Sequence, residues 1–558
     1  MNVMVNGQEV IGQVFGDTSS RFINCRINGP YKVKRGEFVK IIHKENIDDK
    51  PSWLICRVYK IGRYNPLFTE DLITSEEVPS DYLVPESKSE EITAKLEILG
   101  LLRIPSGNLV YSRVPIKPGA IVYKIDRETM SVIFSSDVSS SLLLGRLIGY
   151  ETADTSIPVY VSINDLVTQH LAVLAMTGAG KSYTVGRIME GLLAQVNARI
   201  LVLDIHGEYG YMYYQGEMRT NNDPLADREY SQERTKLIEK IREKKSLGGG
   251  IKVFCPESKS AIQKYGYGNY QSLRLKLDSL SQELLSTILP GLTEPQHRVL
   301  NLALKAWFDE PEPRNPDQLL SLLRNPEKLA HISELSEIER KAVSSRSAAI
   351  VALRLRNLIE DTGVFYTGTI GRPTEIEDIV GTIEDRAGHI TIVDFLDMPI
   401  EYCQVASAVI LNQLLMKSKI PNRKIPNVFT VVEEAHNYIP QSGSPVCKDT
   451  LIRIISEGRK FGLGICAISQ RPSRIDSDVL SQCNSFITMR MKNPEDLSFV
   501  SGVAEYASST DLEEIPALST GEALVFGKAF PLSLLVKIGP RHLRHGGVTP
   551  DVISGWRA

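Results

Sequence analysis

The stretch AMTGAGKSYT (Ala175–Thr184) lies between the apolar run LAVL and the helical pattern VGRIMEGLLAQV. A glycine-bearing loop between a strand and a helix directs backbone N–H groups and the positive helix end at one point, which favours a bound phosphate. We expect Lys181 to reach the β- and γ-phosphates of ATP and the Ser182 hydroxyl to bind Mg²⁺. Ala175 replaces the first glycine of the usual pattern GxxxxGK[ST] and is small enough for the same turn. The predicted nucleotide-binding residues are Thr177, Gly178, Ala179, Gly180, Lys181, Ser182 and Tyr183.

A second chemical signal is the apolar run NVFTVV, which ends in two adjacent carboxylates, Glu433 and Glu434. Beside a phosphate loop, the first acid of such a pair supports Mg²⁺, commonly through water, and the second polarises the attacking water. We therefore expect Glu433 to support the metal and Glu434 to be the catalytic base. His436 either couples the nucleotide state to movement or is only a hydrogen-bonded loop residue.

Three further segments carry polar side chains just beyond an apolar strand or helix. Asp204, His206 and Glu208 follow RILVL, where a parallel sheet has its ligand-facing loops, and they are candidate coupling residues; a polar surface turn would have the same composition. Gln470 ends the run GICAIS and is either a γ-phosphate sensor or an ordinary loop amide. Arg459 ends a helical pattern, where it either complements the helix dipole or is an arginine finger for a neighbouring subunit.

The elements that must position these residues differ along the chain. Short β-rich runs separated by turn residues predict a small antiparallel barrel or sandwich up to about residue 165. From Leu171 the strands are almost continuously apolar, which is typical of a parallel sheet covered by helices in an α/β domain. Helical spacing without strands between Ser272 and about Glu360 predicts a helical insertion. The expected domains are a barrel (1–165), an ATPase core in two parts (166–270 and 365–540), the helical insertion (271–364) and a carboxy-terminal tail (541–558).

Composition limits the function classes. The 558 residues include 64 basic and 67 acidic side chains, for a net charge of −3, which excludes a chain coated in nucleic-acid-binding charge but allows a local basic surface. Seven cysteines without a CxxC pair predict reduced core residues. No apolar run approaches the roughly 20 residues that cross a bilayer, and the first residues do not resemble a signal peptide. We therefore expect a soluble, cytoplasmic protein that makes no membrane contact.

Six segments, taken in order, resemble the HerA family of hexameric DNA-translocating ATPases, within the HerA/FtsK superfamily. They are AMTGAGKSYT, LDIHGEYG, VVEEAHNYIP, SEGRKFG, ISQRPSRID and GEALVFGKAF…RHLRHGG. The combination of DIHGEY, EEAH and EGRKFG is the specific part of the resemblance. It implies a RecA-like P-loop core, an amino-terminal HAS barrel, and a homohexamer that encircles duplex DNA and binds ATP and Mg²⁺ between subunits. It also implies that Glu434 activates water, Gln470 senses the γ-phosphate and Arg459 acts in trans.

The same resemblance implies partners and leaves two functions open. HerA proteins work with the NurA nuclease, and in archaea alongside the break-processing nuclease and its SMC-like ATPase, in the resection of DNA ends at double-strand breaks. The alternative is an ATP-dependent platform that recruits an effector nuclease through the barrel, for example in antiviral defence, with little translocation. The ending GPRHLRHGGVTPDV either braces the ring or approaches the nucleotide, as in the family, or is a mobile basic tail. Candidate pore residues are Arg340, Lys341 and Arg346.

Overall fold

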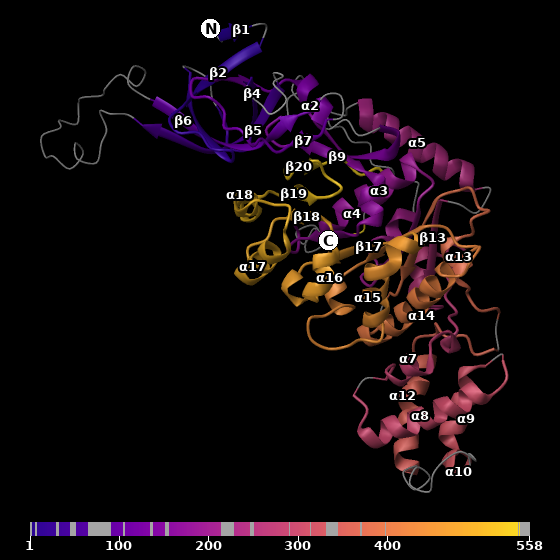
Figure 1. The fold of residues 1–558 in the computed structure, drawn as a ribbon. Helices are drawn as coiled ribbons and strands as arrows, with labels where there is room; N and C mark the ends of the chain where they lie inside the picture. The colour runs from indigo at the N-terminus through magenta and orange to yellow at the C-terminus, as the bar shows by residue number, and fades with distance from the viewer. Residues whose placement is uncertain are drawn as a thin grey trace, which may run out of the picture. The chain divides into compact units, whose positions relative to one another are not determined.

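The chain forms two compact units (Figure 1). The first comprises Met1–Val138, Gly145–Tyr160 and Leu535–Lys537, and the second comprises Ser139–Leu144, Val161–Leu534 and Ile538–Ala558. The computed structural model describes residues 3–5, 8–28, 33–44, 52–64, 91–103, 107–133, 138–150, 156–213, 228–245, 250–289, 291–312, 314–330, 344–368, 371–396, 398–544 and 546.

The first unit contains a closed antiparallel barrel. Its strands neighbour one another in the order β2, β3, β6, β5, β4 and β8, and β8 also pairs with β2, which closes the ring. Ile11, Ile41, Leu54, Leu96 and Val122 are buried in its core. The barrel predicted from the turn-rich sequence is therefore confirmed. The strand bounds are β1 (Val3–Val5), β2 (Gln8–Phe15), β3 (Phe22–Ile27), β4 (Phe38–His43), β5 (Ser52–Tyr64), β6 (Glu91–Leu102), β7 (Leu109–Val110) and β8 (Ile121–Lys124).

The second unit is built on a mainly parallel sheet. Neighbouring strands run in the order β18, β11, β17, β16, β12, β15 and β13, all parallel, and β19 joins β18 antiparallel. Every residue of β12, β15, β16 and β17 is buried, as the apolar runs predicted. The bounds are β11 (Leu171–Leu174), β12 (Arg199–Asp204), β13 (Gly250–Cys255), β14 (Gln271–Ser272), β15 (His389–Asp394), β16 (Val428–Val432), β17 (Leu463–Ser469), β18 (Ser485–Met489) and β19 (Glu522–Gly527).

The boundary between the units divides the strands β9 (Ser141–Leu147), β10 (Pro158–Ser162) and β20 (Leu534–Ile538). The remaining helices outside the insertion are α2 (Arg127–Ile133), α3 (Ile163–Thr168), α4 (Lys181–Gln195), α5 (Arg228–Lys245), α6 (Lys259–Tyr265), α13 (Ile376–Val380), α14 (Ile400–Ser418), α15 (Lys448–Glu457), α16 (Ser477–Gln482), α17 (Pro494–Val503) and α18 (Ser509–Glu514). Short 3-10 helices include η2 (Gly210–Tyr213), η4 (Ala435–Asn437) and η5 (Gly458–Phe461).

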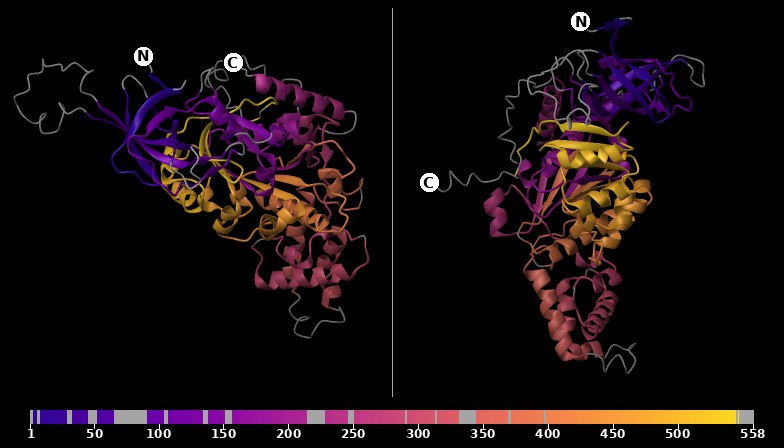
Figure 2. Two further views of the ribbon diagram at one scale, coloured as in Figure 1. Left: turned by 45° about the horizontal axis from the view of Figure 1, so that its top comes forward. Right: turned by 90° about the vertical axis from the view of Figure 1, so that its left-hand side faces the viewer.

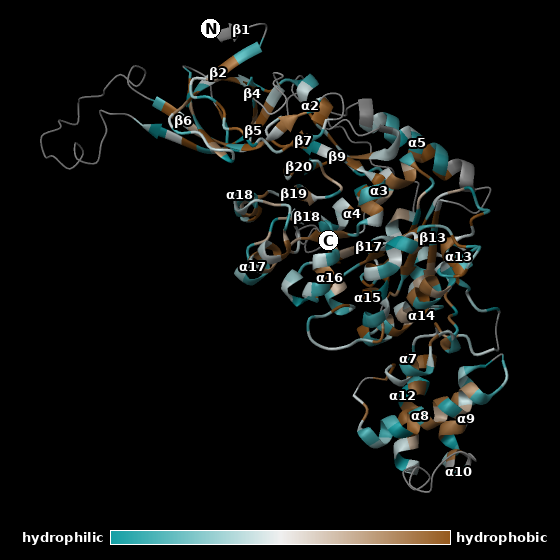
Figure 3. Cartoon of the chain, viewed as in Figure 1, coloured by the Kyte–Doolittle hydropathy of each residue, from teal (hydrophilic) through white to brown (hydrophobic). Residues whose placement is uncertain are grey.

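A helical bundle interrupts the second unit between β14 and β15, as Figures 1 and 2 show. The chain enters and leaves it at one place, because Leu275 N–H donates to Val364 O at 2.6 Å and Tyr366 N–H donates to Leu275 O at 2.9 Å. Its longer helices carry both brown, apolar and teal, polar residues in Figure 3. Trp307, Leu319 and Leu355 are buried. The helices are α7 (Gln282–Ser286), α8 (Glu294–Asp309), α9 (Pro316–Arg324), α10 (Pro326–Ala330) and α12 (Ser345–Glu360).

The predictions on cysteines, membrane-spanning helices and pore residues can be compared with the structure. All seven cysteines are buried with free thiols, as predicted. Within the described part of the chain, no helix is both long and apolar enough to span a membrane. Of the candidate pore residues, Arg346 is exposed on α12, and Arg340 and Lys341 lie outside the described residues.

The carboxy-terminal segment is attached to the helix that follows the phosphate loop. The buried carboxylate of Glu190 on α4 accepts from Arg541 Nε at 3.0 Å and from the backbone N–H groups of His542 and Leu543 at 2.6 and 3.2 Å. Arg541, His542 and Leu543 are themselves buried. The alternative of a mobile basic tail is therefore wrong for residues 541–543, because Glu190 compensates their buried donors. Residues 547–558 lie outside the described part of the chain.

Gly186 makes room for this attachment. A β-carbon at Gly186 would lie 2.3 Å from Arg541 Cζ, and Arg541 cannot move aside without leaving Glu190. We expect Gly186→Ala to destabilise the second unit by about 1–3 kcal/mol despite the better helix propensity of alanine. Differential scanning fluorimetry should show a lower unfolding midpoint.

The matched control is Gly502→Ala near the end of α17, because a β-carbon at Gly502 would meet nothing within 4 Å. This variant should unfold at the wild-type temperature or slightly above it. Equal midpoints for the two alanine variants would contradict the close packing of Arg541 on α4.

Candidate nucleotide site

The phosphate loop connects the buried strand β11 to the first residue of α4, Lys181. Gly178 and Gly180 have left-handed backbone angles, with φ of 78° and 106°, which residues with a β-carbon rarely adopt. A β-carbon at Gly180 would also lie 3.2 Å from Met489 Cε. Ala175 is fully buried, so a small side chain at this position is compatible with the loop.

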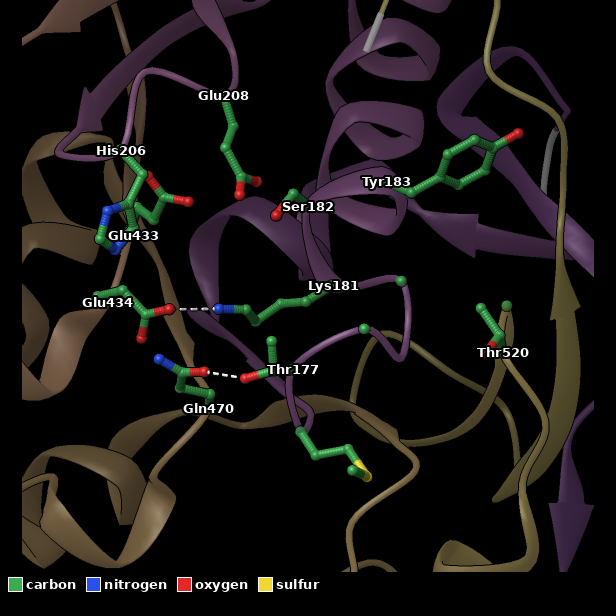
Figure 4. A pocket seen from close by; sticks show the side chains of 14 residues that line it. Thr177, Lys181, Ser182, Tyr183, His206, Glu208, Glu433, Glu434, Gln470 and Thr520 are labelled. Atoms are coloured by element: carbon green, nitrogen blue, oxygen red, sulfur yellow. Dashed lines mark hydrogen bonds and ion pairs between the residues drawn. The ribbon is translucent and has the colours of Figure 1, made fainter. Parts of the chain in front are cut away.

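A pocket of about 760 Å³ surrounds this loop (Figure 4). Its lining includes most of the residues predicted from the sequence: Thr177, Gly178, Gly180, Lys181, Ser182, Tyr183, His206, Glu208, Glu433, Glu434 and Gln470. Ala179 is buried and contributes its carbonyl, which accepts from Gly521 N–H at 3.1 Å. The sequence analysis missed Met176, Thr520 and Gly521, which also line the pocket.

Lys181 and Glu434 form an ion pair across the pocket, with Nζ 2.6 Å from Oε1 (Figure 4). Burial alone would raise the pKa of Glu434, but the hydrogen bond with His436 and the charge of Lys181 lower it to about 2. Glu434 also has a left-handed backbone, with φ of 47° and ψ of 53°, at the turn between β16 and η4. Such a conformation costs a non-glycine residue free energy and is typical of functional sites.

His436 does not line the pocket but contacts the carboxylate behind it. Its Nδ1 lies 3.2 Å from Glu434 Oε2 and 3.1 Å from Ser469 Oγ. Ser469 is the last residue of β17, and its hydroxyl also accepts from Arg471 N–H at 2.9 Å. The sequence analysis missed Ser469, which is fully buried at the end of an apolar run.

Glu433 and Asp204 form a buried carboxyl pair at the ends of the neighbouring strands β16 and β12. Burial raises the pKa of Glu433 well above its ordinary value, and the charge of Asp204 and a hydrogen bond to it act in the same direction. Burial and the charge of Asp394 raise the pKa of Asp204. The pKa values of both carboxyl groups are therefore raised by burial and by neighbouring negative charge.

Asp204 also fixes the loop that carries His206 and Glu208 to the pocket. Its Oδ1 accepts from Gly207 N–H and Glu208 N–H at 2.8 and 3.2 Å, and its Oδ2 accepts from Tyr209 N–H at 2.9 Å. Asp204 itself does not line the pocket, so its contact with the site runs through this loop and through Glu433.

The side-chain oxygen atoms of Ser182 and Glu433 suit a magnesium ion. Glu433 Oε2 is buried without a hydrogen-bond partner, and Ser182 lines the same pocket. A hydroxyl and a carboxylate oxygen are ligands that Mg²⁺ accepts, and Mg²⁺ usually takes its remaining ligands from water and substrate phosphates. Ser182 and Glu433 are thus the residues that would hold the ion.

Gln470 lines the pocket, whereas Arg459 does not. Gln470 lies at the end of β17 and accepts a hydrogen bond from the Thr177 hydroxyl of the phosphate loop (Figure 4). Arg459 is exposed in η5 and does not line its own chain's pocket. In the amide orientation that satisfies both residues, the Gln169 oxygen accepts from both terminal nitrogens of Arg459, each at 3.3 Å.

Several known proteins are similar to this chain. Residues 143–414 match the family model described as "Helicase HerA, central domain". The chain is 27% identical to the DNA double-strand break repair helicase HerA of Pyrococcus furiosus, over 98% of this chain and 97% of the relative. It is also 27% identical to the helicase of the same name from Sulfurisphaera tokodaii, over 98% and 96%. The VirB4 structure of Thermoanaerobacter pseudethanolicus is similar at a TM-score of 0.46 and 15% identity, over 73% of this chain and 97% of that chain. Over nearly its whole length the chain is similar to helicases named HerA, and it is a P-loop ATPase.

Proposed function

We propose that this protein is an ATP-driven translocase or helicase on double-stranded DNA that acts in double-strand break repair. The observation that supports it best is a hydrolytic set around one pocket, in which Lys181, Ser182, Glu433, Glu434 and Gln470 all take part. Relatives named as double-strand break repair helicases, matched over nearly their whole length, support the DNA substrate and the repair role.

In the first step of the mechanism, ATP replaces Glu434 as the ionic partner of Lys181. The triphosphate of ATP is a stronger anionic partner for Lys181 than one carboxylate, so binding draws the ammonium group away from Glu434. Loss of that neighbouring positive charge raises the pKa of Glu434 from about 2 and makes it a better proton acceptor. The base thus becomes effective only when substrate has arrived.

Other side chains orient the reaction. His436 keeps the Glu434 carboxylate in place after Lys181 leaves, because its contact with Oε2 does not involve the phosphate loop. Gln470 responds to the γ-phosphate, since its carbonyl oxygen is bonded to Thr177 of the loop. Mg²⁺, held by Ser182 and Glu433 when it is bound, supplies neutralising charge to the phosphates.

We further propose that six copies form a ring with ATP at the interfaces. Exposure of Arg459 outside its own pocket supports its entry into a neighbour's site, where a planar guanidinium suits the developing phosphoryl charge. The barrel would dock a NurA-type nuclease, and in archaea the complex would work with the break-processing nuclease and its SMC-like ATPase.

Substitutions of Glu434 and Lys181 should affect ATP hydrolysis and ATP binding separately. Glu434→Gln should still bind ATP but hydrolyse it about 100-fold more slowly or worse, because the proton acceptor is lost. Lys181→Ala should weaken ATP binding about tenfold or more, because the charged phosphate contact is lost. Calorimetric titration and a phosphate-release assay give both values.

Glu505→Gln is the control, because Glu505 is exposed and lies outside the pocket. It should leave binding and turnover unchanged. Near-normal turnover by Glu434→Gln would remove Glu434 from the role of base.

Arg459→Ala tests the trans arginine. The variant should form intact rings with little hydrolysis, and mixing it with Glu434→Gln subunits should restore activity, because each variant supplies what the other lacks. Lys460→Ala is a matched control, since this cation is exposed at the same helix end but is not the proposed finger. Equal losses in both variants, or failure of Arg459→Ala to assemble, would overturn the assignment.

A translocation assay distinguishes a DNA motor from a platform that binds DNA without moving along it. The wild-type protein with ATP should displace streptavidin from biotinylated duplex DNA, and displacement should weaken as salt rises because backbone contacts are electrostatic. Binding of duplex without displacement would instead support the platform that recruits an effector nuclease. Displacement unaffected by salt would contradict a backbone-tracking motor.

A further inference from the structure

The loop that carries His206 and Glu208 to the pocket has a second attachment besides Asp204. The backbone carbonyl of Gly207, which lies between these two residues, accepts from Lys264 Nζ of α6 at 2.9 Å. The approach is close, because a β-carbon at Gly207 would lie 2.3 Å from Lys264 Nζ. Lys264 does not line the pocket, so its contact with the site runs through this loop.

Asp394 fixes the ammonium group of Lys264. Its Oδ2 accepts from Lys264 Nζ at 2.7 Å and also from the Tyr265 hydroxyl. Its Oδ1 accepts from Leu396 N–H at 2.9 Å. The Asp394 side chain is fully buried and that of Lys264 is 17% exposed. Opening the pair would leave a buried carboxylate without its cation, which is strongly unfavourable, so the ammonium group stays beside the loop.

The ends of two neighbouring strands thus hold one loop. Asp204 ends β12 and Asp394 ends β15, and the two residues are partners in the parallel register. Asp204 accepts directly from backbone N–H groups of the loop, whereas Asp394 holds the loop's carbonyl through Lys264. We infer that Lys264 and Asp394 are positioning residues for ATP hydrolysis, which fix the His206–Glu208 loop against the phosphate loop. This inference rests on the proposed hydrolysis of ATP in this pocket.

The position of this loop should affect ATP turnover more than ATP binding. In Figure 4 the Glu208 side chain points toward Ser182 across the pocket. The groups proposed to hold the phosphates lie in the phosphate loop and at the start of α4, not in the His206–Glu208 loop. A small misplacement of groups around the reacting atoms lowers the rate steeply. Loss of the Lys264 contact should therefore lower kcat with little change in ATP affinity.

Lys264→Met tests this role, because methionine is also unbranched but cannot donate to Gly207 O. In the full-length protein, kcat should fall about tenfold or more. The calorimetric affinity for a non-hydrolysable ATP analogue should change by less than about twofold. Lys259→Met is the matched control and should leave both values unchanged, because Lys259 is exposed at the start of the same helix. A normal kcat in Lys264→Met, or a loss of affinity as large as the loss of kcat, would overturn the positioning role.

A double variant, Lys264→Met with Asp394→Asn, separates positioning from stability. It contains no unpaired buried carboxylate at residue 394, so its unfolding midpoint should lie above that of Lys264→Met. Because Gly207 O still lacks its donor, kcat at a temperature below both midpoints should stay as low as in the single variant. Recovery of kcat together with the midpoint would show a merely structural pair and overturn the inference. Absence of ATP hydrolysis by the wild-type protein would overturn the proposed function itself.

Discussion

The ion pair between Lys181 and Glu434 is the contact on which the account of this protein depends. It joins residues that are 253 positions apart in sequence, and both side chains are largely removed from solvent. Leaving one member of a buried charge pair without its partner is strongly unfavourable, so each charge needs a new partner when this pair opens. In the proposed mechanism the triphosphate is that partner for Lys181, and its arrival raises the pKa of Glu434.

The parallel sheet makes this contact possible. The strands β11, β17, β16 and β12 are neighbours, so their carboxyl ends lie along one edge. That edge brings together Thr177 after β11, Gln470 after β17, Glu434 after β16 and the Asp204 loop after β12. Ligands of open α/β sheets bind at such an edge. The helical insertion enters and leaves between β14 and β15 at one place.

Local patterns in the sequence predicted the phosphate loop, the acidic strand end and the buried strands, because each has a signature in a few adjacent residues. Thr520 and Gly521 have no such signature. They reach the pocket only because Gly521 pairs with Ala179 and Ile538, which are distant in the chain.

Burial of side chains explains other differences between the sequence predictions and the structure. Residues 541–543 were compatible with a basic tail, but Glu190 pairs with Arg541 and accepts from the backbone N–H groups of His542 and Leu543 inside the second unit. A distant partner of this kind is invisible in sequence. Glu433 was expected only as a metal support, and the structure adds a raised pKa, because Glu433 is buried beside Asp204. The partner of Arg459 could not be found from one chain's sequence, because the proposed partner is a second copy.

The ATPase rate of the purified protein without DNA, with single-stranded DNA and with blunt duplex tests the central claim most directly, with Glu434→Gln as the blank. The account predicts that duplex strongly stimulates hydrolysis and that the blank shows none under any condition. Equal hydrolysis with and without duplex would contradict a DNA-driven motor.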